Sequence, residues 1–400
     1  MQLFSDQPLR ERPHIAVLGS HKLGNFVVTT PLLRSLKAKY PDCTLDFFGS
    51  DLTRELETHL PTLDWRFSLH CTVTGANDGE SESEPKAASE PTPEQGQLSD
   101  RLQTAIQQRR YRHGHYDLAI NCDEYSALTH QAMAALHPTY VVGGATASPF
   151  KHQLDFGQHP VQCMLQDPNW NGPTFAQKYR AVTQTNYITE LLCRLAYVET
   201  DFTRLDMPTH PPRFKVPDVL VHVTASRAAK LWVPSYWQQV IAWCHQQGLS
   251  VGLVGDCPAV QRQRYHAADS EDHLLSTTGL IDLRGQATLP QLAGALAQTQ
   301  AFVTVDTGPL HMAAAVGCPT VAIFGNDHDG DGASPVRLWA PRQPWVKLAL
   351  SAAKCTRCQE QRFKNQACLQ PQHHCMVALP PQTVIKLLQD CLGKSEGVMG

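Results

Sequence analysis

The sequence of 400 residues has no apolar run that approaches the roughly 18 residues needed to span a bilayer. Its first residues, MQLFSDQPLRERPH, lack the apolar core that signal peptides have. Only 18% of the residues are charged, and no concentrated basic patch indicates a nucleic-acid surface. We therefore expect a globular cytoplasmic protein that does not bind nucleic acid.

Residues 73–100, VTGANDGESESEPKAASEPTPEQGQLSD, contain no aromatic residue and carry seven acidic side chains against one lysine. A stretch so rich in Glu, Ser and Pro cannot bury enough apolar surface to offset the entropy lost on ordering. We predict that residues 73–100 form a disordered acidic insert, a solvated tether within the first domain.

Outside this insert, short apolar runs alternate with helical segments. The predicted strands cover 14–18, 44–48, 117–121 and 140–142 in the first half, and 219–223, 250–254, 301–305 and 320–324 in the second. Predicted helices between them include 31–40, 235–247 and 289–298. Strands that alternate with helices predict parallel sheets with crossover connections, and hence an α/β fold.

The chain is long enough for two domains, because one hydrophobic core rarely serves more than about 250 to 300 residues. Residues 204–218, RLDMPTHPPRFKVPD, contain four prolines and are typical of an interdomain linker. We predict one Rossmann-like domain over 1–210, a second over 211–375, and a C-terminal helix and tail over 376–400. Ligands of such sheets bind at the carboxyl ends of the strands, so a central cleft faced by both sheets is the expected site.

Residues 301–325, AFVTVDTGPLHMAAAVGCPTVAIFG, place a polar turn between a buried strand and a helix. The backbone N–H groups of Gly308 and Leu310 and the helix dipole favour an anion after Thr307. His311, in the first helical turn, could donate a hydrogen bond to a phosphate. The alternative is a capped strand–helix junction with a packed histidine.

A second candidate segment, VLVHVTASRAAKLWVPSYW, begins at residue 219. Thr224, Ser226 and Lys230 follow its strand, and hydroxyls with a lysine suit a phosphate ligand. Such loops are also common on solvent-exposed surfaces. The two segments gain weight together because both would open on the same edge of one sheet.

Four of the thirteen cysteines lie close together near the C-terminus, in residues 355–375. Cys355, Cys358, Cys368 and Cys375 follow the spacing C-x2-C-x9-C-x6-C, which can supply a tetrahedral structural zinc site. Disulfide or redox pairing and unligated buried thiols are the alternatives that the spacing leaves open.

Taken together, these segments resemble glycosyltransferase family 9, whose best-known members are the ADP-heptose:lipopolysaccharide heptosyltransferases. LGNFVVTTPLLRSLKAKYP, HVTASRAAKLWVPSYWQQVI and the residues from Asp282 to Gly325 carry the resemblance, which is strongest in the last of these. It implies the GT-B architecture, in which the first Rossmann-like domain binds the acceptor and the second binds the nucleotide-sugar. It also implies inversion by direct displacement, with no cofactor required for catalysis.

The resemblance assigns the nucleotide-sugar site residue by residue. The expected contacts to the donor diphosphate are Thr224, Ser226 and Lys230. The expected other wall, around the diphosphate and sugar, consists of Asp306, Thr307, Gly308 and His311. A possible structural zinc in the cysteine-rich residues is the one metal that we expect.

The first segment departs from the family at the position of its general base. The heptosyltransferases have Gly-Asp there, whereas this chain has Gly24 followed by Asn25. An amide is not basic near neutral pH, so Asn25 could orient the acceptor but not deprotonate it. The remaining candidates for the base are Asp123 and Glu124, after the strand DLAIN, and His21.

We thus expect an inverting glycosyltransferase that moves a sugar, heptose from ADP-heptose, onto a lipopolysaccharide core or a related cell-surface glycan. Two alternatives stay open: a family member that uses another nucleotide-sugar, and a weakly active or non-catalytic relative that binds a nucleotide-sugar or glycan. With such an acceptor, peripheral contact of the protein with the inner face of the inner membrane is a further open expectation.

Overall fold

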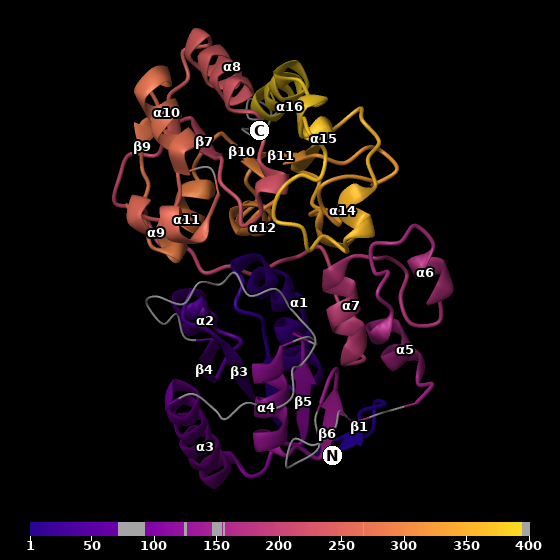
Figure 1. Ribbon diagram of the computed structural model, residues 1–400. Helices are drawn as coiled ribbons and strands as arrows, with labels where there is room; N and C mark the ends of the chain where they lie inside the picture. Colours follow the sequence, from indigo (N-terminus) through magenta and orange to yellow (C-terminus); the bar gives the residue numbers. More distant parts are fainter. Residues whose placement is uncertain (71–92, 124–125, 146–153, 155–156, 267, 394–400) are drawn as a thin grey trace. The chain divides into compact units, whose positions relative to one another are not determined.

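The computed structural model describes residues 1–70, 93–123, 126–145, 154, 157–266 and 268–393 (Figure 1). The chain divides into two compact units, Met1–Phe202 and Thr203–Gly400. This division falls just before the proline-rich residues 204–218. Within the described ranges, no helix is long and apolar enough to cross a membrane.

The first unit is built on a parallel sheet of six described strands, in the order β1-β6-β5-β2-β3-β4. The strands are β1 (Gln2–Leu3), β2 (His14–Leu18), β3 (Thr44–Ser50), β4 (Trp65–His70), β5 (Leu118–Asn121) and β6 (Tyr140–Val142). The helices are α1 (Leu23–Lys39), α2 (Arg54–His59), α3 (Pro93–His113), α4 (Ala127–Leu136), α5 (Pro160–Gln166), α6 (Phe175–Lys178) and α7 (Ile188–Leu195).

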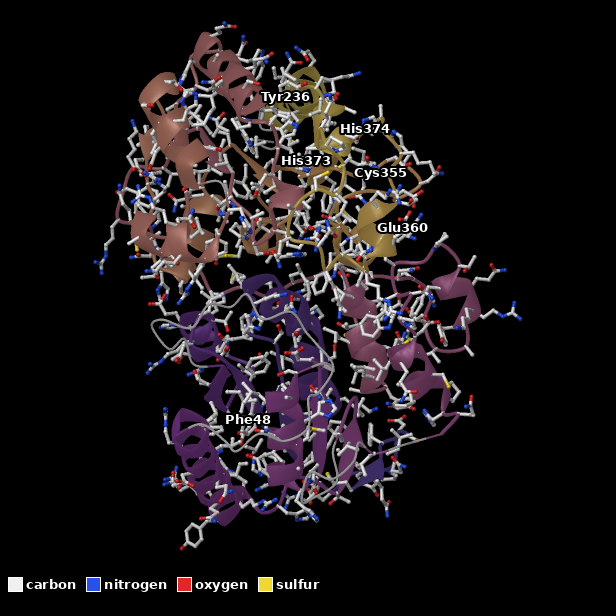
Figure 2. The ribbon with its side chains drawn as sticks, viewed as in Figure 1. Phe48, Tyr236, Cys355, Glu360, His373 and His374 are labelled. Carbon is white, nitrogen blue, oxygen red and sulfur yellow. The ribbon has the colours of Figure 1, made fainter. Side chains whose placement is uncertain are left out.

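The central strands of this sheet are apolar because helices cover both of their faces. Every residue of β2 is buried, and Phe48 on β3 is fully enclosed in the core (Figure 2). Helix α1 starts at Leu23, earlier than the predicted start at Pro31, and runs through that proline. Packing decides this, because α1 buries most of its length, including Phe26 and Leu33.

Helix α3 corrects the predicted limits of the acidic insert. Most of the insert lies outside the described residues, but α3 begins at Pro93, so the end of the predicted segment is helical. Leu102 and Ile106, one helical turn apart, are buried in the core cluster of this unit. Their burial stabilises a helix whose first turns have no apolar pattern of their own.

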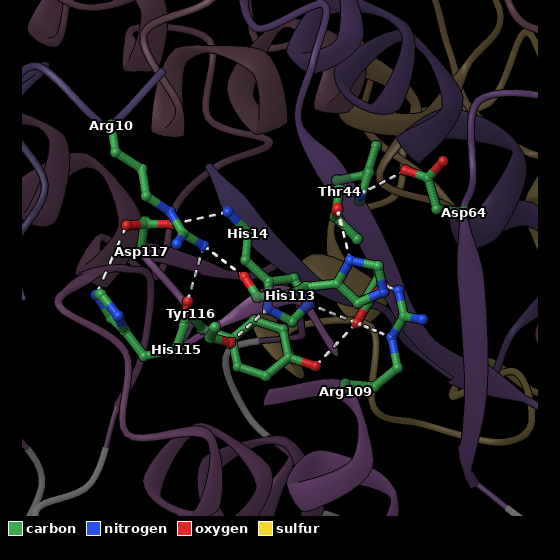
Figure 3. Close-up of polar contacts among 12 residues, drawn as sticks. Arg10, His14, Thr44, Asp64, Arg109, His113, His115, Tyr116 and Asp117 are labelled. Carbon is green, nitrogen blue, oxygen red and sulfur yellow. Dashed lines mark hydrogen bonds and ion pairs between the residues drawn. The ribbon is translucent and has the colours of Figure 1, made fainter. Parts of the chain in front are cut away.

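A buried polar network also fastens α3 to the sheet (Figure 3). The carboxylate of Asp46 on β3 accepts hydrogen bonds from His14 Nε2 (2.8 Å), Arg109 Nη2 (2.6 Å) and the Tyr116 hydroxyl (2.9 Å). Burial alone would raise the pKa of Asp46, but His14 and Arg109 outweigh it and hold the pKa below its ordinary value. The network thus joins β2, β3 and α3.

The second unit repeats this plan with six described parallel strands in the order β12-β11-β10-β7-β8-β9. The strands are β7 (Val219–His222), β8 (Val251–Leu253), β9 (Ile281–Asp282), β10 (Ala301–Val305), β11 (Thr320–Phe324) and β12 (Val346–Leu350). The helices are η1 (Ala228–Lys230), α8 (Pro234–Gln246), α9 (Pro258–Arg264), α10 (Ala268–Thr278), α11 (Leu289–Leu296), α12 (Gly308–Ala315), α13 (Val336–Trp339), α14 (Arg357–Glu360), α15 (His374–Val377) and α16 (Pro381–Gly393).

The strand order of the second unit is that of a Rossmann sheet, in which the order reverses between the first and fourth strands, here β7 and β10. Helix α16 packs against α8 and against β10, β11 and β12. The α/β fold with two parallel, Rossmann-like sheets that the sequence predicts is therefore confirmed.

Candidate active site

The carboxyl ends of β7 and β10 lie side by side in the second sheet, where the two strands pair in parallel register. This is the point where the strand order reverses, at which α/β sheets bind their ligands. We call Thr224–Lys230 the β7 loop and Asp306–His311 the β10 turn. The structure thus brings to one sheet edge all the residues predicted to bind the nucleotide-sugar: Thr224, Ser226, Lys230, Asp306, Thr307, Gly308 and His311.

An ion pair joins the two segments. Lys230 Nζ lies 2.7 Å from Asp306 Oδ2 and also donates to the Asp306 carbonyl oxygen at 3.3 Å. Burial raises the pKa of Asp306, but Lys230, the Ser334 hydroxyl and His311 together hold it below its ordinary value. Asp306 is therefore ionised and fixes the Lys230 ammonium at the switch point.

His222, at the end of β7, links the β7 loop and the β10 turn. Its ring nitrogens lie 3.3 Å from Thr224 Oγ1 and 3.4 Å from Thr307 Oγ1. Burial lowers the pKa of His222 to about 4, so the ring is neutral near neutral pH. The sequence prediction missed His222, although a histidine that ends an apolar strand at a switch point is a recognisable pattern.

The β10 turn opens helix α12, and Thr307 precedes it without a side-chain cap. The Leu310 N–H, expected to face an anion, instead donates to the Thr307 carbonyl at 3.1 Å, because the first turn closes on itself. His311 is buried and stands edge-on to Trp339. Burial lowers the pKa of His311 to about 4, so it offers a neutral ring to a ligand.

Two buried side-chain nitrogen atoms close to Asp306 have no hydrogen-bond partner in the part of the chain that the structure describes. They are His311 Nδ1 and Arg227 Nε, and both residues interact electrostatically with Asp306. Buried polar atoms in native proteins are nearly always bonded. Unpartnered buried atoms beside an ammonium group mark this sheet edge as a candidate place for a polar ligand.

A buried chain of polar side chains supports Thr224 from behind. Gln261 Nε2 donates to Thr224 Oγ1 (3.3 Å) and to Glu271 Oε1 (3.0 Å), and Glu271 Oε2 lies 3.4 Å from Arg284 Nη1. Burial raises the pKa of Glu271 to about 7, although Arg284 opposes the shift. No local pattern in the sequence indicates this network, because its members come from α9, α10 and the end of β9.

The first unit has its own switch point, between β2 and β5. Gly24 and Asn25, which precede the predicted helix 31–40, lie in the first turn of α1. A Cβ on Gly19 would approach the Phe47 ring to 2.5 Å, so the glycine allows the chain to leave β2 close to β3. The half-buried side-chain amide of Asn25 has no hydrogen-bond partner among the described residues, whereas its carbonyl accepts from Thr29 Oγ1.

The structure places the three alternative candidates for the base in different surroundings. His21 is exposed between β2 and α1. Asp123 follows β5, and its backbone N–H and carbonyl bond to Asn121 Oδ1 (3.0 Å) and Thr129 Oγ1 (2.8 Å) in the turn before α4. Glu124 lies outside the described residues. Asn25, His21 and Asp123 thus come from one sheet edge, and their roles stay predictions.

The four predicted metal ligands lie near one another in the second unit. They belong to what we call the cysteine segment, residues 355–375, of which Figure 2 labels Cys355, Glu360, His373 and His374. Burial raises the pKa of Cys375 to about 12, and the other three thiols add to the shift. Among the described residues, no group of three or more His, Cys, Asp or Glu side chains is arranged to hold a metal ion. The structural zinc stays a prediction.

Comparison with known proteins agrees with this arrangement. The model of glycosyltransferase family 9 (heptosyltransferase) matches residues 108–366. Lipopolysaccharide heptosyltransferase 3 of Escherichia coli is 22% identical over 308 residues, which cover 76% of this chain and 80% of that protein. Among solved structures, a family 9 glycosyl transferase from Veillonella parvula has a TM-score of 0.64 at 15% identity and covers 96% of this chain and 97% of its own.

The structure of E. coli ADP-heptose LPS heptosyltransferase II gives a TM-score of 0.61 at 16% identity and covers 96% of this chain and 99% of its own. At such identity the likeness shows the fold, which is the GT-B class of two Rossmann-like sheets. Because the family model matches more than half of the chain, the chain belongs to glycosyltransferase family 9. It is a glycosyltransferase.

Proposed function

We propose that this glycosyltransferase moves heptose from ADP-heptose to a sugar of a lipopolysaccharide core or a related cell-surface glycan. The Lys230–Asp306 pair between the β7 loop and the β10 turn is the observation that carries the proposal, because it fixes a cation where an anionic donor would bind. The names of the relatives, which are lipopolysaccharide and ADP-heptose heptosyltransferases, support the choice of sugar and acceptor.

The proposed reaction is a direct displacement with inversion at the anomeric carbon. The acceptor hydroxyl oxygen forms a bond to that carbon, and the bond from the carbon to the diphosphate oxygen breaks. ADP leaves with the electron pair. Lys230, Arg227 and the N–H at the start of α12 would stabilise the negative charge that grows on the leaving group, so the protein itself supplies the cations for this step.

The proton of the acceptor hydroxyl must go to another group than Asn25, whose amide we propose orients the acceptor. His21, Asp123 and Glu124 are the proposed alternatives for this base. Asn25 also favours a second candidate function, a weakly active or non-catalytic protein that binds a nucleotide-sugar. An acceptor anchored in lipid would place the protein at the cytoplasmic face of the inner membrane.

A donor panel tests the proposal. Thermal-shift measurements with ADP-, UDP- and GDP-sugars, followed by transfer assays with the best binder, should select ADP-heptose and give a glycosylated acceptor. If another nucleotide-sugar binds best and is transferred, that sugar takes the place of heptose in the proposal. Tight binding with no turnover over the whole panel would favour the non-catalytic function.

Replacement of Asn25 tests its role separately. We expect Asn25→Ala to lower turnover about tenfold, the upper range for the loss of one hydrogen bond, while leaving ADP affinity unchanged. ADP affinity is the control, because Asn25 belongs to the first unit and the proposed ADP site to the second. Wild-type turnover in this variant would remove Asn25 from the mechanism.

A further inference from the structure

The cysteine segment contains three bulky residues in the left-handed backbone conformation. They are Arg362 (φ 50°), Phe363 (φ 58°) and His373 (φ 40°). Such residues rarely adopt a positive φ, because the side chain then crowds the backbone. Strained backbone persists only where the surrounding structure imposes it, and it concentrates where a function depends on geometry.

Two of these three residues hold the β7 loop directly. The guanidinium of Arg227 donates to the Phe363 carbonyl through Nη1 and to the Ala333 carbonyl through Nη2 (2.6 Å). His373 Nε2 lies 2.9 Å from the Ala229 carbonyl oxygen, to which it donates. The strain therefore coincides with the contacts that the segment makes to the proposed diphosphate site.

Ala229 is held at both of its backbone groups. Its N–H donates to the Gln366 carbonyl at 3.0 Å, and its carbonyl accepts from His373. It stands in the middle of η1, a turn of three residues that ends at Lys230. So short a 3-10 turn has little stability of its own. The contacts from Gln366 and His373, which lie outside the β7 loop, therefore help to place Lys230 opposite Asp306.

The cysteines organise the segment that makes these contacts. Asn365 Nδ2 donates to Cys358 Sγ (3.2 Å), and the Gln370 N–H donates to Cys368 Sγ (3.4 Å). Cys358 and Cys375, both within the segment, are buried. The thiols therefore hold the loop that carries Phe363, Gln366 and His373 in its strained form.

We propose that the cysteine segment positions the β7 loop, with His373 as a positioning residue, and thereby sets the affinity of the enzyme for a nucleoside diphosphate. This inference rests on the proposed function only in its assignment of the β7 loop to the diphosphate. His373 acts through Ala229 and does not itself touch the substrate.

The test compares neighbouring histidines, which Figure 2 labels on the same stretch of chain. His373→Asn keeps a residue that tolerates the left-handed conformation but is too short to reach Ala229. His374→Asn is the matched control, because His374 is exposed. His373→Gln restores a donor of similar reach. The readouts are the hydrogen-exchange rate of the Ala229 amide, ADP affinity by calorimetry, and the donor KM and kcat.

We expect His373→Asn to raise the exchange rate of the Ala229 amide and to weaken ADP binding about fivefold, the loss typical of one hydrogen bond. The donor KM should rise with little change in kcat. His374→Asn should match the wild type, and His373→Gln should recover part of the affinity. Recovery separates positioning from a general loss of stability.

Unchanged exchange at Ala229 and unchanged ADP affinity in His373→Asn would overturn the proposal. The exchange measurement needs no ligand. If the wild type fails to bind ADP, the proposed function fails, and exchange at Ala229 still decides whether the segment holds the loop. If His373→Asn does not fold, His373→Gln and His373→Ala provide the same comparison. Equal exchange rates of the Ala229 amide in these two variants would overturn the proposal.

Discussion

At the scale of single residues, the site depends on a cation held in place by an ionised carboxylate. Lys230 is about one-fifth exposed and Asp306 is buried, so the pair is shielded on one side and open on the other. The buried carboxylate holds the ammonium group in one position, and the partly exposed side of the ammonium can still contact a ligand. Lys is suited to phosphate as a point charge.

Removal of this cation gives the first prediction. Lys230→Ala should weaken ADP binding by about ten- to a hundredfold, because a hydrogen bond to a charged group contributes roughly 1.5 to 3 kcal/mol. Calorimetric titration with ADP measures the effect. Lys215→Ala, at an exposed position of the same unit, is the control and should bind as the wild type does. Equal affinity in both variants would remove Lys230 from the site.

The residues of the candidate site were predictable only where they directly follow an apolar strand in the sequence. Thr224 and Lys230 follow one strand, and Asp306 to His311 follow another, so strand ends alone indicated them. His222 and Gln261 were missed. Gln261 reaches Thr224 across 37 positions of sequence, and a contact that long leaves no periodic pattern to detect.

A second prediction concerns Glu271, whose pKa burial raises from an ordinary 4.5 to about 7. The folded state then binds more protons than the unfolded state between these pH values, so the free energy of unfolding falls as pH rises through this window. Glu271→Gln should abolish that part of the pH dependence. Denaturant unfolding at a series of pH values between 4.5 and 7 measures it.

Asp272 is the matched control for this experiment. It lies next to Glu271, but hydrogen bonds from Arg262 and Arg284 lower its pKa from an ordinary 3.8. Its contribution to stability is therefore lost only at more acidic pH. Asp272→Asn should change the slope over this pH window much less than Glu271→Gln does, because the Asp272 charge is the smallest of the named causes that shift the pKa of Glu271. A Glu271→Gln variant with the wild-type slope would show that Glu271 titrates normally.

At the scale of elements, the buried strands were the most predictable part of the fold. β2, β6, β10 and β11 have the predicted limits, because strands buried on both faces are continuous apolar runs. The sequence prediction missed β1, β4, β9 and β12, the edge strands of the two sheets. β1 and β9 are two residues long, too short for any pattern. The start of α1 was missed because tertiary packing overrides the helix-breaking tendency of Pro31.

The cysteine segment gives a third prediction at this scale. If the four thiols bind a structural zinc ion, protein purified without chelator should carry about one zinc per chain by elemental analysis, as a tetrahedral site of four thiolates does. Cys355→Ser with Cys358→Ser should remove it, whereas Cys163→Ser, in the first unit, should not. Metal-free wild-type protein would exclude the zinc site and leave disulfide or redox pairing and unligated thiols as the alternatives.

At the scale of the whole molecule, the two units share one architecture but carry different chemistry. Each has a parallel sheet with a single reversal of strand order, at β2 and β5 in the first unit and at β7 and β10 in the second. The residues proposed to bind the nucleotide all belong to the second unit, and Asn25 belongs to the first. We therefore expect the edge in the second unit to bind the donor and the edge in the first unit to bind the acceptor.

This separation predicts a localised response to ADP. Hydrogen exchange should slow at the β7 loop and the β10 turn when ADP binds, because the ligand protects the backbone groups around it. The carboxyl edge of the first sheet, around Asn25, should exchange at the rate of the free protein. Protection at Asn25 with none at Thr224 to Lys230 would place the nucleotide in the first unit.

The contacts of the β7 loop also bear on how the protein is made. Arg227 bonds to Phe363 and Ala229 to His373, across 136 and 144 positions of sequence. Translation proceeds at about 5 to 20 residues per second, and pairing between such distant segments is slow to form. On the ribosome, the β7 loop therefore waits many seconds for the segment that shapes it. We therefore expect the second unit to reach its full affinity for a nucleotide only after residues 355–375 have been made.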